Sequence, residues 1–382
     1  MSAPTGFALY HAALDQLRDQ SRLRSLKPRL GIDFTSNDYL GLAASSRLRD
    51  AVSAAAERGV PVGAGGSRLL RGNSPEHEAL EAQAAQFFQA ERSLYFGSGY
   101  VANYAVLSTL PQNEDLVVLD ALAHASAHEG TRAGRATVTR AIHNDAGSVD
   151  EQIRAWRSRG GRGRAWVAVE SLYSMDGDKA PLVDLQAVCL RHEAILFVDE
   201  AHATGVFGPD GRGLASEWEG AENVLVLHTC SKALGGAGAL INGPKILLDF
   251  LVNRSRPFIF ATAPSPLMAV AAGEALKSLK EEPERRQRLA HLVEVAAGAA
   301  RRHYLGVPRH SQIIPMIVGD DKNAISLADI LQERGFDVRA VRPPSVPEGT
   351  ARLRISLTLN VDEKAVLDLF DALAEAWRTL VP

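Results

Sequence analysis

The chain has 382 residues, of which 46% are hydrophobic and 23% charged, and its formal net charge is -3. This is the composition of a globular protein with room for two or three packed units, and the slight acidity argues against proteins that bind nucleic acid or anionic membranes by charge. The two cysteines, Cys189 and Cys230, lie far apart and lack metal-ligand spacing, so we expect neither a disulfide framework nor a metal site.

The N-terminal segment predicts an amphipathic helix over residues 7–26, followed by a short strand at residues 32–35. Charged residues interrupt its apolar positions early, which argues against a secretory signal. The most apolar stretch, residues 266–279, is shorter than the roughly 20 residues that a membrane span needs. We therefore expect a cytoplasmic protein that begins with a helix and arm over residues 1–45.

The central part of the chain repeats a pattern of apolar strand, turn and helix. Strands are predicted at residues 93–96, 116–119, 136–140, 165–170, 195–199 and 224–228. Continuous apolar strands that alternate with helices indicate a mostly parallel sheet covered on both faces. We expect this large α/β domain to span residues 46–264.

The order of elements changes after Pro264. The patterns predict helices that end near residues 279 and 304, a strand at 313–318, another helix, strands at 337–341 and 353–357, and a last helix from residue 362. Strands and helices mixed in this way are typical of a smaller α+β domain, which we expect over residues 265–382.

Two residues at predicted strand ends, Asp199 and Lys232, are the main candidates for catalysis. By itself Asp199 fits a helix cap or an ion pair, and Lys232 fits an exposed surface lysine. Together they match a specific chemical need: a lysine must reach the aldehyde of pyridoxal phosphate (PLP), while a carboxylate keeps the pyridine nitrogen protonated. Open α/β sheets place ligands at such strand ends.

Residues near this pair fit further parts of the same cofactor. His202 is placed to hydrogen-bond the phenolic oxygen, and the hydroxyls of Thr229 and Ser231 are suited to the phosphate. The segment at Gly99 and Tyr100 follows a strand and opens a helix, whose positive end attracts phosphate. His124 fits either a ring that stacks on the cofactor or a structural histidine, and these residues alone do not decide between the two.

Four motifs together resemble one enzyme family: Phe34-Thr-Ser-Asn-Asp-Tyr-Leu-Gly-Leu42, Glu170-Ser-Leu-Tyr-Ser-Met-Asp-Gly-Asp178, Val198-Asp-Glu-Ala-His-Ala-Thr-Gly-Val-Phe-Gly208 and Thr229-Cys-Ser-Lys232. From about residue 30 onward the chain is similar to the α-oxoamine synthases, which use PLP. The resemblance implies the aspartate-aminotransferase-like α/β fold (PLP fold type I), with a large domain around a mostly parallel sheet and a smaller C-terminal α+β domain.

The resemblance also implies a role for each candidate residue. Lys232 is expected to bind the cofactor aldehyde, Asp199 to pair with the ring nitrogen and His124 to stack on the ring, as the three catalytic residues. The other expected cofactor contacts are Gly99, Tyr100, Ser174, His202, Thr229, Ser231 and Thr262, the last from a neighbouring subunit. The expected substrate contacts are Arg24, Asn37, His124, Ser345 and Arg354, with the Arg354 guanidinium suited to a carboxylate.

The activity that the resemblance implies is the decarboxylative condensation of a small amino acid with an acyl thioester, in a homodimer with sites at the subunit interface. The segment from Val341 to Ser356 favours family members that join L-alanine to a pimeloyl thioester. Glycine with a different acyl-CoA is the alternative within the family, and a non-catalytic scaffold is an alternative outside it. The sequence leaves open whether coenzyme A or a carrier protein holds the acyl group.

Overall fold

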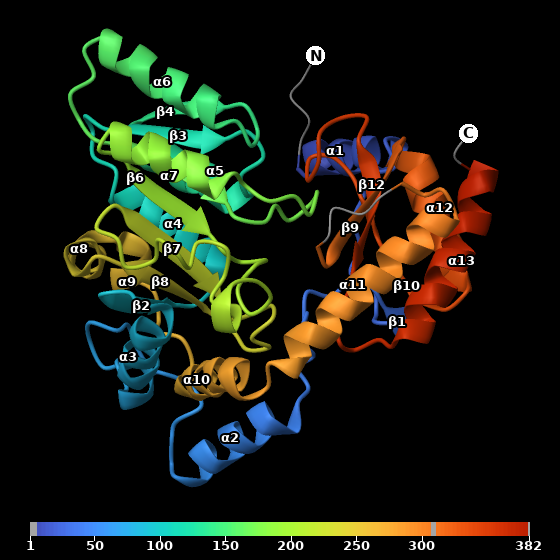
Figure 1. The fold of residues 1–382 in the computed structure, drawn as a ribbon, viewed down its shortest axis with the longest axis horizontal. Coiled ribbons are helices and arrows are strands. Elements are labelled where there is room, and N and C mark those ends of the chain that lie inside the picture. The colour runs from blue at the N-terminus through green and yellow to red at the C-terminus, as the bar shows by residue number, and fades with distance from the viewer. Residues whose placement is uncertain (1–5, 307–310, 381–382) are drawn as a thin grey trace. The chain divides into compact units, whose positions relative to one another are not determined.

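The computed structural model describes residues 6–306 and 311–380, and the chain divides into two compact units (Figure 1). The larger unit holds residues 38–174 and 178–287, and the smaller one holds the described parts of residues 1–37, 175–177 and 288–382. Helix α10 (Pro266–Glu281) packs on helices α2 (Ser46–Glu57) and α3 (Pro75–Phe88), and so belongs to the larger unit. The domain bounds drawn from the sequence stay predictions.

The larger unit is built on a seven-stranded sheet with the order β2-β8-β7-β6-β5-β3-β4. Its strands are β2 (Arg92–Phe96), β3 (Leu116–Asp120), β4 (Thr137–Ala141), β5 (Ala165–Glu170), β6 (Ile195–Asp199), β7 (Val224–Thr229) and β8 (Ala239–Gly243). The pairs from β4 across to β7 are parallel, and only β8 runs against its neighbours. The α/β fold with a mostly parallel sheet is therefore confirmed.

Helices cover both faces of this sheet (Figure 1). They are α4 (Gly99–Thr109), α5 (Ala125–Ala133), α6 (Ala146–Ser158), α7 (Leu182–Arg191), α8 (Lys245–Arg254) and α9 (Arg256–Ile259), with a short 3-10 turn at Pro209–Gly211. Apolar residues of α4, α5, α8 and α9 pack on one face, and those of α6 and α7 pack on the other. Burial on both faces explains why the strands read as continuous apolar runs.

Strand β8 is the one strand of this sheet that the sequence patterns did not predict. It holds Asn242 and ends at Gly243, and both residue types are unfavourable in strands. The amide of Asn242 is nevertheless buried and donates to Glu219 Oε1 at 2.9 Å. A specific buried partner thus outweighs a poor local preference.

The smaller unit combines short sheets with helices. Its elements are α1 (Ala8–Asp19), β1 (Ile32–Asp33), most of α11 (Glu284–Arg302), β9 (Ile313–Gly319), α12 (Asp321–Glu333), β10 (Phe336–Asp337), β11 (Ala340–Val341), β12 (Ala351–Ser356) and α13 (Glu363–Leu380). Strands β11, β12 and β9 form an antiparallel sheet, and β1 pairs with β10 in parallel. The α+β character predicted for this part of the chain is present.

Two sequence predictions in this unit need correction. The first helix ends at Asp19 instead of residue 26, because Ser21 has a φ of 58°, which is left-handed backbone that a helix cannot contain. The single strand predicted at residues 337–341 is two short strands, since β10 pairs with β1 whereas β11 pairs with β12.

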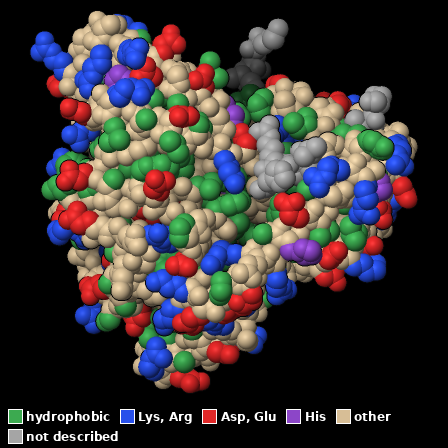
Figure 2. All heavy atoms as spheres, viewed as in Figure 1, with side chains coloured by type: hydrophobic (Ala, Val, Ile, Leu, Met, Phe, Trp, Pro, Cys, Tyr) green, Lys and Arg blue, Asp and Glu red, His purple; other side chains and the backbone are tan. Residues whose placement is uncertain are grey.

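Within residues 6–306 and 311–380, no helix is long and apolar enough to cross a bilayer. On the face that Figure 2 shows, lysine and arginine side chains are interspersed with aspartate and glutamate. Mixed charge of this kind fits the small net charge of the chain.

Candidate active site

The predicted cofactor residues of the larger unit gather at one edge of its sheet. They end or closely follow strands β2, β3, β5, β6 and β7, and are Gly99, Tyr100, His124, Ser174, Asp199, His202, Thr229, Ser231 and Lys232. These five strands run in the same direction, so their carboxyl ends lie along a common edge. Ligands of open α/β sheets bind at this edge.

Asp199 is held in place through both of its carboxylate oxygens. Asn103 Nδ2, on α4, donates to Oδ2 at 2.7 Å, and the backbone N–H of Ala201 donates to Oδ1 at 2.9 Å. The side chain is buried at the end of β6. Hydrogen bonds from N–H groups favour the charged form of a carboxylate, so Asp199 is suited to face a protonated nitrogen.

Lys232 lies in a chain of polar contacts with His202 and Tyr39. The Nζ of Lys232 is 2.8 Å from His202 Nε2, and the Tyr39 hydroxyl is 2.6 Å from His202 Nδ1. An ammonium group can only donate, so His202 accepts at Nε2 and carries its own proton on Nδ1, toward the tyrosine oxygen. Tyr39 is fully buried, which fixes the imidazole in this orientation.

His124 caps the N-terminus of α5 and connects to Asp199 through other side chains. Its Nδ1 is 2.7 Å from Ser126 Oγ, which accepts from Asn103 Nδ2 at 3.0 Å, and Asn103 also holds Asp199. Desolvation lowers the pKa of His124, with Asp199 opposing the shift and Lys232 adding to it. A neutral ring is therefore favoured, as stacking on a protonated heterocycle requires.

A hydroxyl pair faces the start of α4. Thr229 Oγ1 and Ser231 Oγ are 3.0 Å apart, and Ser98 caps the helix by accepting from the N–H of Val101. A Cβ atom built on Gly99 would lie 3.6 Å from Thr229 Oγ1, so glycine leaves the space between the helix end and this hydroxyl open. Hydroxyls and a helix N-terminus are the donor set that phosphate groups prefer.

A small pocket lies beside His124, Glu170 and Asp199. It is lined by Asn103, Ala123, His124, Ala127, Ala168, Val169, Glu170, Phe197 and Asp199. Apolar residues, a histidine and two acidic residues thus line it, and this set of groups suits a heterocycle that carries one protonated nitrogen. Together with the hydroxyl pair and Lys232, these residues fit PLP.

Sequence reasoning missed four residues that build this site: Tyr39, Asn103, Ser126 and Glu170. Glu170 ends β5 just as Asp199 ends β6, and the two are partners in the register of these parallel strands. An acidic residue at the end of a buried apolar strand was therefore a signal that the sequence already contained. Asn103 and Ser126 lie inside helical patterns, where nothing in the sequence distinguishes them.

The predicted substrate residues other than His124 belong to the smaller unit, which is described by itself. There Arg24 Nη2 donates to Ser345 Oγ at 3.4 Å, and Arg354 Nη1 donates to Ser356 Oγ at 2.6 Å. Arg354 is buried on β12. Asn37 is the last residue of the unit's N-terminal segment. Thr262 is exposed in the larger unit, between α9 and α10.

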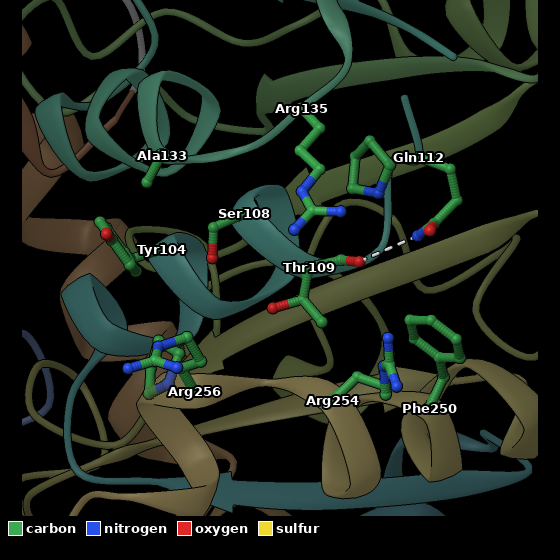
Figure 3. A pocket seen from close by; sticks show the side chains of 11 residues that line it. Tyr104, Ser108, Thr109, Gln112, Ala133, Arg135, Phe250, Arg254 and Arg256 are labelled. Atoms are coloured by element: carbon green, nitrogen blue, oxygen red, sulfur yellow. Dashed lines mark hydrogen bonds between the residues drawn. The ribbon is translucent and has the colours of Figure 1, made fainter. Parts of the chain in front are cut away.

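Another pocket of the larger unit lies at the far end of α4 (Figure 3). It is lined by Tyr104, Ser108, Thr109, Pro111, Gln112, Ala133, Arg135, Phe250, Arg254, Arg256 and Pro257. Three guanidinium groups thus line it together with hydroxyl and amide groups. None of the predicted site residues lines this pocket.

An ionised histidine lies near the site edge and makes stability depend on pH. His143 Nδ1 and Nε2 are each 2.8 Å from a carboxylate oxygen, of Asp120 and Asp178 respectively. Burial alone lowers the pKa of His143, but hydrogen bonds to the two carboxylates outweigh it and raise the pKa to about 9. The raised value means that the proton binds the folded state more tightly than the unfolded one.

We therefore expect a stabilising contribution from His143 that is fully present below its ordinary pKa of about 6.5 and is lost as pH rises through about 9. Urea unfolding between about pH 6 and about pH 10 measures it. The free energy of unfolding should fall more steeply over this range in the original protein than in His143→Gln. Equal slopes in the two proteins would contradict the assignment.

Comparison with known proteins identifies relatives along nearly the whole chain. The family model "Aminotransferase class I and II" matches residues 30–373. The 8-amino-7-oxononanoate synthase of Anaeromyxobacter dehalogenans is 41% identical, over 97% of this chain and 96% of that protein. The enzyme of the same name from Chromobacterium violaceum is 41% identical, over 90% of each chain.

Solved structures show the same fold. A serine palmitoyltransferase from Sphingomonas wittichii superimposes with a TM-score of 0.89 at 27% identity, covering 100% of both chains. One from S. paucimobilis, solved with bound PLP and myriocin, gives 0.88 at 26% identity and 98% of each chain. The 8-amino-7-oxononanoate synthase of Francisella tularensis gives 0.77 at 26% identity, over 91% of this chain and 98% of that one. The resemblance drawn from the four motifs is confirmed.

Proposed function

Because this chain belongs to the family of the 8-amino-7-oxononanoate synthases, within the class I and II aminotransferases, we propose that it joins L-alanine to a pimeloyl thioester. The products are 8-amino-7-oxononanoate, carbon dioxide and the free thiol, a reaction of biotin biosynthesis. The chain is a PLP-dependent acyltransferase. The observation that carries this function is the polar arrangement of Asp199, His202 and Lys232 at the carboxyl edge of the sheet.

PLP, when bound, accepts the electron pair that the substrate Cα atom releases. We assign Lys232 Nζ to the aldehyde end and the Asp199 carboxylate to the ring nitrogen. His124 would cover one face of the ring, and His202 would hydrogen-bond the phenolic oxygen. The start of α4 at Gly99 and Tyr100, with Ser174, Thr229 and Ser231, completes the cofactor contacts, and Thr262 adds one from a neighbouring subunit.

Lys232 Nζ also serves as the base for the amino acid. With the cofactor and L-alanine bound, the free Nζ would be the group that accepts the Cα proton and that returns a proton to the same carbon after loss of carbon dioxide. His202, 2.8 Å away in the structure, keeps the lysine amine oriented for both transfers. Asn103 Nδ2 and the N–H of Ala201 donate to the Asp199 carboxylate and hold it in place.

Residues of the smaller unit are proposed to bind the substrates. The guanidinium of Arg354 suits the carboxylate of the amino acid, since its planar fork pairs with both oxygens. Arg24, Asn37 and Ser345 are proposed as further substrate contacts, together with His124 of the larger unit. A homodimer with sites at the subunit interface completes the proposal, and the cytoplasmic location stays a prediction from the sequence.

A substrate panel tests the function directly. The purified holoenzyme is assayed for thiol release with L-alanine or glycine, each paired with pimeloyl-, acetyl-, succinyl- and long-chain acyl-CoA. We expect L-alanine with the pimeloyl thioester to give the highest kcat/KM, by about tenfold or more over any other pair. Preference for glycine with another thioester would replace the proposed reaction by that of a different α-oxoamine synthase.

A further inference from the structure

Two buried carboxyl groups face the same pocket. Glu170 and Asp199 are register partners on the parallel strands β5 and β6, which places their backbones about 4.8 Å apart. Both side chains line the pocket beside His124, and their residues are 4% and 8% exposed. Two like charges this close in a desolvated site repel strongly, so one of the two groups is favoured in its neutral form.

The hydrogen-bond partners show which of the two keeps its proton. Asp199 accepts through both oxygens, from Asn103 and from the N–H of Ala201. Glu170 accepts only through Oε2, from the N–H of Ser174 at 3.2 Å, whereas its buried Oε1 has no hydrogen-bond partner among the described residues. Donors stabilise the charge on Asp199, and the proton therefore belongs on Glu170 Oε1.

The surrounding charges support the same assignment. Burial, and after it the charge of Asp199, raises the pKa of Glu170 to about 8, and Asp120 at the end of β3 adds to the shift. Lys232 and the N–H of Ser174 oppose it without reversing it. The other titratable groups near this carboxyl are His124 and Tyr173. Burial lowers the pKa of His124 and raises that of Tyr173, so both side chains favour their neutral forms.

We propose that Glu170 is a positioning residue that carries a proton on Oε1 and leaves Asp199 as the single charged carboxylate facing the cofactor's ring nitrogen. The pair then presents one negative charge to one protonated nitrogen. Ionisation of Glu170 at high pH adds a second charge beside the ring, which makes the heterocycle a weaker acceptor of electrons.

The proposal rests on the cofactor of the proposed function but not on its substrates. Its test therefore uses the holoenzyme with neither amino acid nor thioester present, so that a wrong substrate assignment leaves the result intact. The absorbance of bound PLP is titrated from about pH 6 to about pH 10 in the original protein and in Glu170→Gln, and the affinity for PLP is measured at about pH 7.

We expect the original protein to show an alkaline transition in the cofactor absorbance that Glu170→Gln lacks. Glutamine keeps the shape of a protonated glutamate, so its PLP affinity should stay within about threefold of the original. Glu170→Met, also neutral and of similar length, repeats the titration should the glutamine variant fold poorly. Loss of PLP affinity in Glu170→Gln as severe as in Asp199→Asn would overturn the proposal, because Glu170 would then be needed as a charge.

Glu200 provides a matched control. It is also a buried glutamate directly after a strand, and burial raises its pKa to about 7, but both of its oxygens accept backbone N–H groups, from Leu214 and Ala215. Glu200→Gln should retain the alkaline transition of the cofactor. A transition that persists in Glu170→Gln, or that disappears in Glu200→Gln as well, would show that Glu170 is not its source.

Discussion

Replacing Lys232 with alanine is expected to lower kcat by about 10⁴-fold or more. In the proposed function the side chain supplies both the link to the cofactor aldehyde and the base for the Cα proton, and in the structure its Nζ lies 2.8 Å from His202 Nε2. The visible absorbance of the lysine-bound cofactor should disappear with the activity. Thiol release and an absorbance spectrum measure the two effects.

Lys179→Ala is the control for this variant. Lys179 is an exposed lysine of the same unit whose Nζ lies 4.3 Å from the ring centre of Phe207. It does not line the pocket beside His124 and Asp199, so its removal should leave both the spectrum and the rate essentially unchanged. A Lys232→Ala protein with the original activity would refute the role of Lys232, whatever the control shows.

Replacing Asp199 with asparagine is expected to lower kcat by about 10²- to 10³-fold and to weaken PLP binding. Asparagine preserves the volume of the side chain but removes the charge that keeps the ring nitrogen protonated. Its amide NH₂ also faces Asn103 Nδ2, which now donates to the carboxylate at 2.7 Å, so one amide must turn or lose a partner.

The variant Asp199→Glu distinguishes the effect of the negative charge from the effect of its position. It keeps the negative charge but moves it outward by one methylene group, so we expect PLP to remain bound with a rate between those of the original protein and Asp199→Asn. Rates and PLP affinities of all three proteins are compared at one pH. Asp199→Asn with unchanged affinity and rate would mean that another group carries the charge.

Much of the fold could be predicted from the sequence, because buried parallel strands appear there as continuous apolar runs. Strands β5 and β6 are continuous apolar runs that end in an acid, and helix α7 lies between them in the chain, so the α/β class and the edge expected to bind the ligand could both be predicted. Strand β8 could not, since its Asn242 finds a buried partner that is distant in sequence. The first helix was predicted too long because left-handed backbone at Ser21 leaves no trace in apolar periodicity.

The candidate site shows the same contrast between residues that the sequence suggests and residues that only the fold reveals. Asp199 and Lys232 could be proposed from the sequence because their residue types and positions at or just after strand ends match one cofactor. Asn103 and Tyr39 were not, because their importance lies in contacts across the fold, at 2.7 Å to Asp199 and 2.6 Å to His202. Residues that orient a catalytic group are defined by tertiary geometry, which residue spacing does not encode.

Borohydride reduction of the purified holoenzyme, followed by peptide mass spectrometry, tests the central assignment most directly. Reduction turns the bond between a lysine amine and the cofactor aldehyde into a stable secondary amine. The pyridoxyl phosphate mass should then be found on the peptide that contains Lys232, and it should be absent when L-alanine is added before the reductant. A label on any other lysine, or no label in a protein that turns over its substrates, would contradict the account.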